Sequence, residues 1–161
     1  MYRGVHLAVH KLQKWTRDGS QDQTSLEVVQ RLWAAFELVA THALHVGARV
    51  FVEWPRRRAY WRNDRVVKFL TAHGLINADF DGCMYGLVAS CGRDTGMPIQ
   101  KPWRVACSSN SCLPSMLNRR CDGSHDHTPC QGQNTLLTQG YTPEIVKICL
   151  LYTSPSPRDR G

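Results

Sequence analysis

Two cysteines and two histidines lie within ten residues of one another, in the segment CDGSHDHTPC. The candidate ligands are Cys121, His125, His127 and Cys130. Two thiolates and two imidazoles satisfy the ligand requirement of a tetrahedral zinc site, although the C-x3-H-x-H-x2-C spacing is not one of the common zinc-binding spacings. Two other interpretations remain open from the residues alone: a disulfide between Cys121 and Cys130, or a polar loop that faces a nucleotide.

A carboxylate closes a short apolar run upstream. The residues 49–53 are mostly β-branched or aromatic and end in Glu53, shortly before Pro55, which predicts a buried strand. In open α/β sheets, ligands bind beyond the carboxyl ends of the strands. Glu53 is therefore a candidate for binding a base through a protonated ring nitrogen. The alternative is an ion pair with an arginine of the next loop.

The loop after this strand combines arginines with aromatic side chains. The candidate nucleic-acid-binding residues are Arg56, Arg57, Arg58, Tyr60, Trp61 and Arg62. Arginines supply phosphate contacts and aromatic rings can stack on bases, and the formal net charge of +7 favours an anionic partner. In the alternative interpretation the loop is solvated and its aromatic side chains anchor it to the core.

These residues need a scaffold, and the hydrophobic periodicity predicts one. Thr24 and Glu27 have capping-box spacing at the start of an amphipathic helix. The predicted elements are a helix over 24–47, a strand over 49–53, a helix between Asn63 and Gly74, and a strand over 75–80. Such alternation is typical of an α/β sheet with right-handed crossovers and parallel strands.

The following segments are expected to complete the sheet. Residues 83–88 extend or re-pair the last strand, which makes Cys83 a buried strand thiol in this interpretation. Residues 83–108 form an antiparallel hairpin at the end of the sheet, and residues 113–118 form a short helix. Thr142 caps a final helix with Pro143 in its first turn.

The C-terminal segment differs in origin from the rest. The run CLLYTSPSPRD, from Cys149 to Asp159, resembles a translated reading frame of an adapter used in sequencing libraries. Since residues 149–161 hold two arginines and one aspartate, the remainder has 18 Lys+Arg, 12 Asp+Glu and a net charge of +6. We therefore divide the chain into an irregular segment (1–23), an α/β domain (24–148) and an adapter-derived tail (149–161).

The distribution of apolar residues and cysteines bears on localisation. The start of the chain lacks the apolar core of a signal peptide, and no apolar run reaches transmembrane length. We accordingly interpret the seven cysteines as thiols or metal ligands. An intracellular protein, nuclear or cytoplasmic and without a membrane partner, is the expectation.

Three short motifs, in this order along the chain, carry a resemblance to a known family. They are VEWP (52–55), NADFDGCMYG (77–86) and PIQKPWRV (98–105). Together they resemble the later half of the DNA cytosine-5 methyltransferase fold, and also a methyltransferase-like region of retroelement polyproteins and phage-type genes. The resemblance implies a partial Rossmann-like methyltransferase sheet with crossover helices and a terminal β-hairpin, followed by the Cys/His-rich loop.

The same resemblance implies roles for individual residues. Glu53 matches the glutamate that holds the target cytosine. Gln100 and Arg104 match the glutamine and the last arginine of the family's Gln-x-Arg-x-Arg hairpin, and Arg104 would support the base electrostatically. The chain departs from the pattern at Trp54, where the family has Asn, and at Pro102, where the first Arg would stand.

Two parts of the family's machinery would precede Thr24, namely a Gly-rich cofactor loop and a Pro-Cys nucleophile, and residues 1–23 contain neither. We expect a truncated nucleic-acid-binding fragment, inactive alone, from a metagenomic mobile element. An intact relative would contain the missing N-terminal half and would bind S-adenosylmethionine. The fragment itself would bind no cofactor except zinc. The alternatives are a zinc-stabilised non-enzymatic binding module and a degenerate polyprotein segment.

Overall fold

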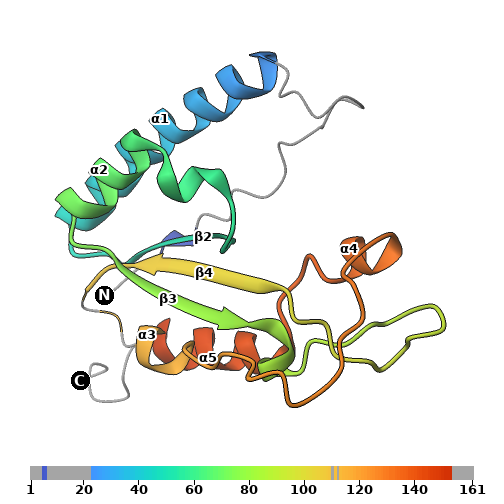
Figure 1. Cartoon of the computed structure of the whole chain (residues 1–161). Helices are drawn as coiled ribbons and strands as arrows, with labels where there is room; N and C mark the ends of the chain where they lie inside the picture. Colours follow the sequence, from blue (N-terminus) through green and yellow to red (C-terminus); the bar gives the residue numbers. More distant parts are fainter. Residues whose placement is uncertain (1–4, 7–22, 110, 112, 154–161) are drawn as a thin grey trace.

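The computed structural model describes residues 5–6, 23–109, 111 and 113–153 (Figure 1). Its strands are β1 (Val5–His6), β2 (Val50–Pro55), β3 (Ile76–Asp81) and β4 (Pro102–Cys107). Its α-helices are α1 (Gln23–His45), α2 (Asp64–Ala72), α3 (Leu113–Met116), α4 (Gln133–Leu137) and α5 (Pro143–Thr153), with 3-10 turns η1 (Ala59–Arg62) and η2 (Gly82–Tyr85). The result is a mixed α/β fold in which helices cover both faces of one sheet.

The strand order is β1-β2-β4-β3. Strands β2 and β3 run in the same direction and are joined through α2, as expected for a crossover unit. However, β4 lies between them and pairs antiparallel with both, while only the two-residue β1 pairs parallel with β2. The predicted hairpin strand is thus the centre of the sheet and not its end, because the burial of four of its six residues favours a position with a neighbour on each side.

One face of the sheet packs against α1 and α2. Four aromatic side chains form its centre: the ring centroids of Trp33 and Trp54 lie 5.4 Å apart, and Phe36 and Phe69 make an edge-to-face contact at 5.6 Å. Such pairs add to the free energy gained by burying apolar area. The predicted first helix and both strands are confirmed, and α1 ends two residues before Gly47.

The opposite face packs against α3 and α5. Its core contains Phe80, Tyr85 and Trp103, with Phe80 at the centre, 5.4 Å from the ring of Tyr85 and 5.5 Å from that of Trp103. The Tyr85 hydroxyl donates to the carbonyl of Met116 at 2.9 Å and accepts from the Arg119 amide at 3.1 Å. The buried tyrosine therefore ties the segment after α3 to the end of β3.

The segment after β3 does not continue as a strand. Residues 82–85 form the 3-10 turn η2, which ends at Gly86 in the left-handed region (φ 76°). The amide of Gly82 donates to the carbonyl of Gln100 at 2.6 Å, and the amide of Leu87 donates to the carbonyl of Gly82 at 3.0 Å. The chain therefore turns sharply at the end of β3, and only the isolated bridge between Val88 and Pro98 continues the pairing.

Apart from β1, the segment 1–22 lies outside the described residues, as does the tail after Thr153. Thr142 accepts a hydrogen bond from the Ile145 amide at 3.3 Å and so caps α5, which continues past Cys149 to Thr153 rather than stopping at the adapter-like run.

None of the helices described is both long and apolar enough to cross a membrane.

Helix α2 connects β2 to β3, and the Asn63 side chain caps its N-terminus. The Asn63 side chain accepts from the amides of Arg65 (3.0 Å) and Val66 (3.4 Å). We expect Asn63→Ala to lower the free energy of unfolding by about 1 kcal/mol, as typical for a lost cap, measured by urea denaturation. Asn63→Asp, which keeps an acceptor, should remain close to the wild type; equal losses in both variants would contradict the capping role.

Candidate metal centre

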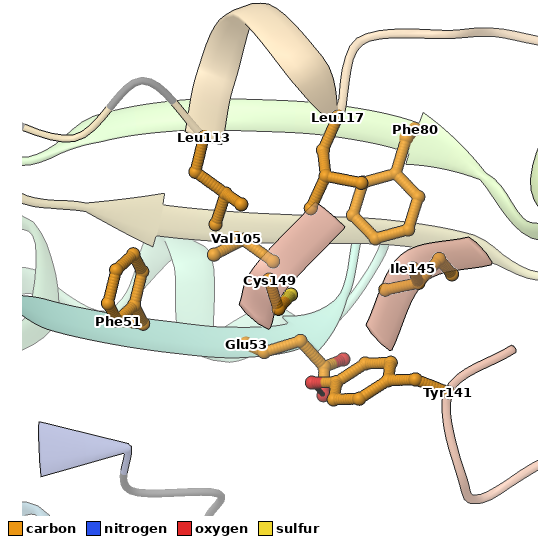
Figure 2. A pocket seen from close by; sticks show the side chains of 9 residues that line it. All are labelled: Phe51, Glu53, Phe80, Val105, Leu113, Leu117, Tyr141, Ile145 and Cys149. Atoms are coloured by element: carbon orange, nitrogen blue, oxygen red, sulfur yellow. Dashed lines mark hydrogen bonds between the residues drawn. The ribbon is translucent and has the colours of Figure 1, made fainter. Parts of the chain in front are cut away.

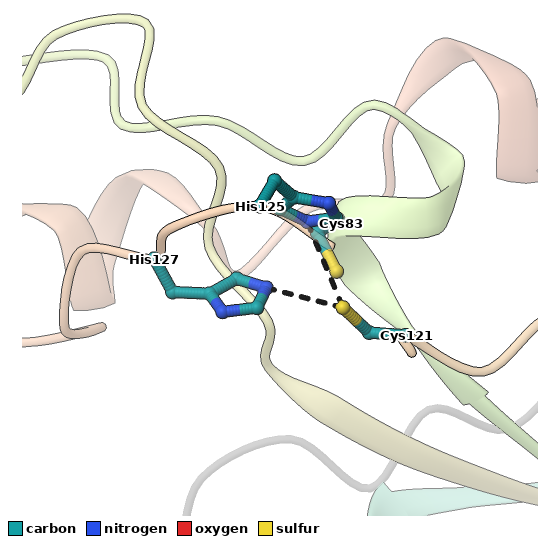
Figure 3. A group of neighbouring side chains, drawn as sticks. All are labelled: Cys83, Cys121, His125 and His127. Atoms are coloured by element: carbon teal, nitrogen blue, oxygen red, sulfur yellow. Dashed lines mark hydrogen bonds between the residues drawn. The ribbon is translucent and has the colours of Figure 1, made fainter. Parts of the chain in front are cut away.

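Four sulfur- and nitrogen-bearing side chains converge at the end of β3 (Figure 3). We call them the Cys/His cluster: Cys83, Cys121, His125 and His127. Each offers one ligand atom, these atoms all lie within 4.8 Å of one another, and all four residues are half-buried. The group is thus close enough to hold one metal ion.

The separations between the Cys121 sulfur and the two histidine nitrogens fit tetrahedral coordination. Bonds of about 2.3 Å to sulfur and about 2.0–2.1 Å to nitrogen place a sulfur and a nitrogen ligand about 3.5 Å apart at the tetrahedral angle. The Cys121 Sγ lies 3.7 Å from His125 Nε2 and 3.5 Å from His127 Nε2. An ion could therefore bind these three atoms with little movement of the chain.

Two segments supply the ligands, and local turns aim them at one point. Cys83 lies in η2, directly after β3. In the loop, the Asp122 side chain accepts from the Ser124 amide at 3.0 Å, and Gly123 has a left-handed backbone (φ 81°). This turn reverses the chain so that His125 returns towards Cys121, whose sulfur accepts from the Gly123 amide at 3.4 Å.

The surroundings of Cys83 favour its protonated thiol in the metal-free protein. Burial, and after it the neighbouring Cys121 thiol, raises the pKa of the Cys83 thiol to about 11. A second thiolate next to the first is costly because like charges in a partly buried site repel each other. A divalent cation bound between the two sulfurs removes this cost, since metal binding releases the thiol protons.

The structure does not bring Cys130 to this cluster. Its sulfur lies 3.3 Å from the Thr138 Oγ1, beside α4, and both Cys121 and Cys130 are free thiols, so the disulfide interpretation is not supported. The loop turns away because Thr128 is anchored elsewhere, its hydroxyl donating to Asp94 at 2.6 Å and its amide to the Pro98 carbonyl at 3.0 Å. Cys83 occupies the fourth position instead.

The sequence did not predict Cys83 as a ligand, because the other candidate ligands all lie within the short segment 121–130. Cys83 is 38 residues from Cys121, and only the return of the chain along β3 brings the two together. The prediction of Cys83 as a buried strand thiol was wrong, because Cys83 lies half-buried in the turn η2; the neighbouring Gly82 was the one signal of a turn at this point.

Glu53 points to the face of the sheet that packs against α3 and α5, away from the arginine loop. The Tyr141 hydroxyl donates to Glu53 Oε2 at 3.0 Å, and burial, followed by the Glu53 charge, raises the pKa of Tyr141. Both side chains line a cavity of about 30 Å³ whose other walls are Cys149 and apolar side chains of the sheet, α3 and α5 (Figure 2). This volume suits about one water molecule and does not suit a base.

Arg104 lies on the opposite face of the sheet from Glu53. In the register of β2 and β4, Glu53 is paired with Val105 and Trp54 with Arg104, and neighbouring residues of a strand point to opposite faces. Arg104 makes a bidentate ion pair with Asp79, at 2.6 and 2.8 Å. The structure therefore does not bring Glu53 and Arg104 into one site. Gln100 is half-buried, and its carbonyl accepts from Gly82.

The arginine loop divides into an anchored and an exposed part. The Trp61 ring is buried at 8 % exposure, its indole N–H donates to the Pro55 carbonyl at 3.2 Å, and it contacts Trp54 at 4.9 Å. Tyr60 is half-buried against Trp54 at 5.3 Å. The two rings thus anchor the loop to the core.

Among the arginines of this loop, Arg56 turns inward, with its NH1 3.4 Å from Asp81 Oδ1. Arg58 is half-buried, whereas Arg57 and Arg62 are exposed. Within the arginine loop, the surface that is exposed to an anionic partner is therefore smaller than the sequence predicted. It consists of guanidinium groups rather than stacking rings.

In comparisons with known proteins, no family model, curated protein or solved structure matched this chain.

Proposed function

We propose that this chain is a non-enzymatic α/β binding module in which the Cys/His cluster binds one structural zinc ion. The convergence of four ligand atoms within 4.8 Å from two distant segments supports this most directly. The donor set of two sulfurs and two imidazole nitrogens is a set that structural zinc sites use. Four protein ligands leave no open position for a water or substrate, which favours a structural over a catalytic ion.

The zinc ion would stabilise a segment that cannot pack by itself. Residues 118–127 are exposed or half-buried, and few of them are apolar. A segment of this composition gains little from the hydrophobic effect, whereas ordering its backbone costs about 1–2 kcal/mol per residue. Metal coordination through Cys121, His125 and His127 would offset that cost and fasten the segment to Cys83 at the end of β3.

The proposed ligand set predicts different effects for two cysteines. Wild-type protein should bind one zinc ion per chain, measured by elemental analysis after dialysis, and chelator should lower its thermal midpoint. Cys83→Ser should weaken zinc binding at least about tenfold, since a ligand is lost. Cys130→Ser is the matched control and should bind zinc as the wild type does.

Opposite effects of these two variants would show that the ligands are those suggested by sequence spacing, with Cys130 in place of Cys83. A wild-type protein without zinc, whose melting is unchanged in chelator, would refute the zinc centre altogether.

A second candidate function is nucleic-acid binding by the target-base half of a methyltransferase-like domain. It is supported by strands β2 and β3, which run in the same direction and are joined through α2 although β4 lies between them, and by the exposed Arg57 and Arg62 in the loop after β2. Base binding by Glu53 would require Tyr141 to move, because the Tyr141 hydroxyl donates a hydrogen bond to the Glu53 carboxylate. The proposal therefore rests on phosphate contacts, and S-adenosylmethionine would bind only in an intact relative.

The exposed arginines predict a salt-dependent contact with nucleic acid. Replacing Arg57 and Arg62 together by Gln should weaken binding to single-stranded DNA and reduce the slope of log K against log salt by about 1.4, since each lost phosphate contact on a single strand removes about 0.7. Fluorescence anisotropy at several salt concentrations measures both quantities. The matched control is Arg93→Gln, an exposed arginine in the loop between β3 and β4; equal effects at Arg93, or binding insensitive to salt, would contradict the assignment.

A further inference from the structure

A buried carboxylate lies next to the Cys/His cluster. Asp81, the last residue of β3, is 2 % exposed, and within the described part of the chain it is the one charged residue that is buried. A buried carboxylate is costly unless it is paired and hydrogen-bonded. Its contacts therefore indicate what it stabilises.

Asp81 holds the loop of the cluster at two points. Its backbone amide donates to the carbonyl of Arg119 at 3.1 Å. Its side-chain Oδ2 accepts from the amide of Cys121 at 2.9 Å. Since Asp81 precedes Cys83 by two residues, this one residue joins the two segments that carry the sulfur ligands.

Two arginines balance the charge of Asp81. Arg56 NH1 lies 3.4 Å from Oδ1, and Arg120 Nε lies 3.5 Å from Oδ2. Both distances are long for a hydrogen bond, and Oδ1 has no hydrogen-bond partner. The short, directional contact of this carboxylate is thus the one to the Cys121 amide, which places Cys121 rather than an arginine.

We propose that Asp81 is a positioning residue that preorganises the metal site by holding Cys121 beside Cys83 before a metal ion binds. This inference rests on the proposed zinc function. Small zinc modules usually fold only when the metal binds. Here the Asp81 contacts would order the segment 119–121 in the metal-free protein, so less ordering would remain for the metal to impose and zinc would bind more tightly.

The full chain carrying Asp81→Ala, Asp81→Asn or Asp79→Ala tests this role. Asp79 lies on the same face of β3 and is also 3.5 Å from Arg120, but its close partner is Arg104. We expect Asp81→Ala to weaken zinc binding about 10- to 100-fold, the usual effect of losing a residue that orients a ligand. Asp81→Asn keeps an acceptor oxygen and should lose less, and Asp79→Ala should stay within about threefold of the wild type.

Two spectroscopic readouts separate positioning from general stability. The Cys121 amide should be protected from hydrogen exchange in the metal-free wild type and in Asp79→Ala, and unprotected in Asp81→Ala. The Co²⁺ absorption bands should shift in Asp81→Ala and recover in Asp81→Asn. If Asp81→Ala does not fold by circular dichroism, Asp81→Asn alone decides through its affinity and Cys121 exchange.

An affinity for zinc within about threefold of the wild type in Asp81→Ala, or an equal loss in Asp79→Ala, would overturn the positioning role while leaving the zinc site intact. A wild-type protein that binds no zinc would instead refute the proposed function, and the role of Asp81 in metal binding with it.

Discussion

The position of β4 between β2 and β3 decides which side chains of this protein can meet. Because successive residues of β4 alternate between the two faces, Trp103 and Val105 point into one core and Arg104 towards Asp79 on the other side. The same register separates Glu53 from the arginine loop. It also leaves the carboxyl end of β3 beside the returning chain at residues 119–121, where Asp81 and Cys83 find their partners. The sheet register thus excludes a joint site for Glu53 and Arg104, and the chain reversal after β3 brings Cys83 close to Cys121.

The proposed metal centre would stabilise a different part of the molecule from the hydrophobic cores. The cores on the two faces of the sheet need no metal, since their aromatic clusters bury large apolar areas. The loop around Cys121 lacks such residues and is held by polar contacts: the Asp81 carboxylate, the turn at Gly123 and the link between Thr128 and Asp94. We therefore expect loss of the metal to loosen this loop and leave the sheet folded, unlike the complete unfolding of an isolated zinc finger.

Local patterns in the sequence predicted the elements well and their pairing poorly. The helix between Asn63 and Gly74, the helix from Thr24 and the strand before Pro55 follow from side-chain chemistry within a few residues, and all are present. The insertion of β4 and the recruitment of Cys83 depend on contacts between residues far apart in the chain, which periodicity does not report. Three of the four cluster residues could be predicted from the sequence. For the aromatic side chains of the arginine loop, the sequence allowed either stacking on bases or anchoring of the loop to the core, and in the structure they anchor the loop.

X-ray absorption at the zinc edge of the wild-type protein tests the central claim most directly, because it counts the ligand atoms around the ion. The Cys/His cluster predicts two sulfurs at about 2.3 Å and two nitrogens at about 2.0–2.1 Å, and a single sulfur in Cys83→Ser. A six-coordinate shell of oxygen and nitrogen, or a sulfur count unchanged in Cys83→Ser, would contradict a zinc centre built from Cys83, Cys121, His125 and His127.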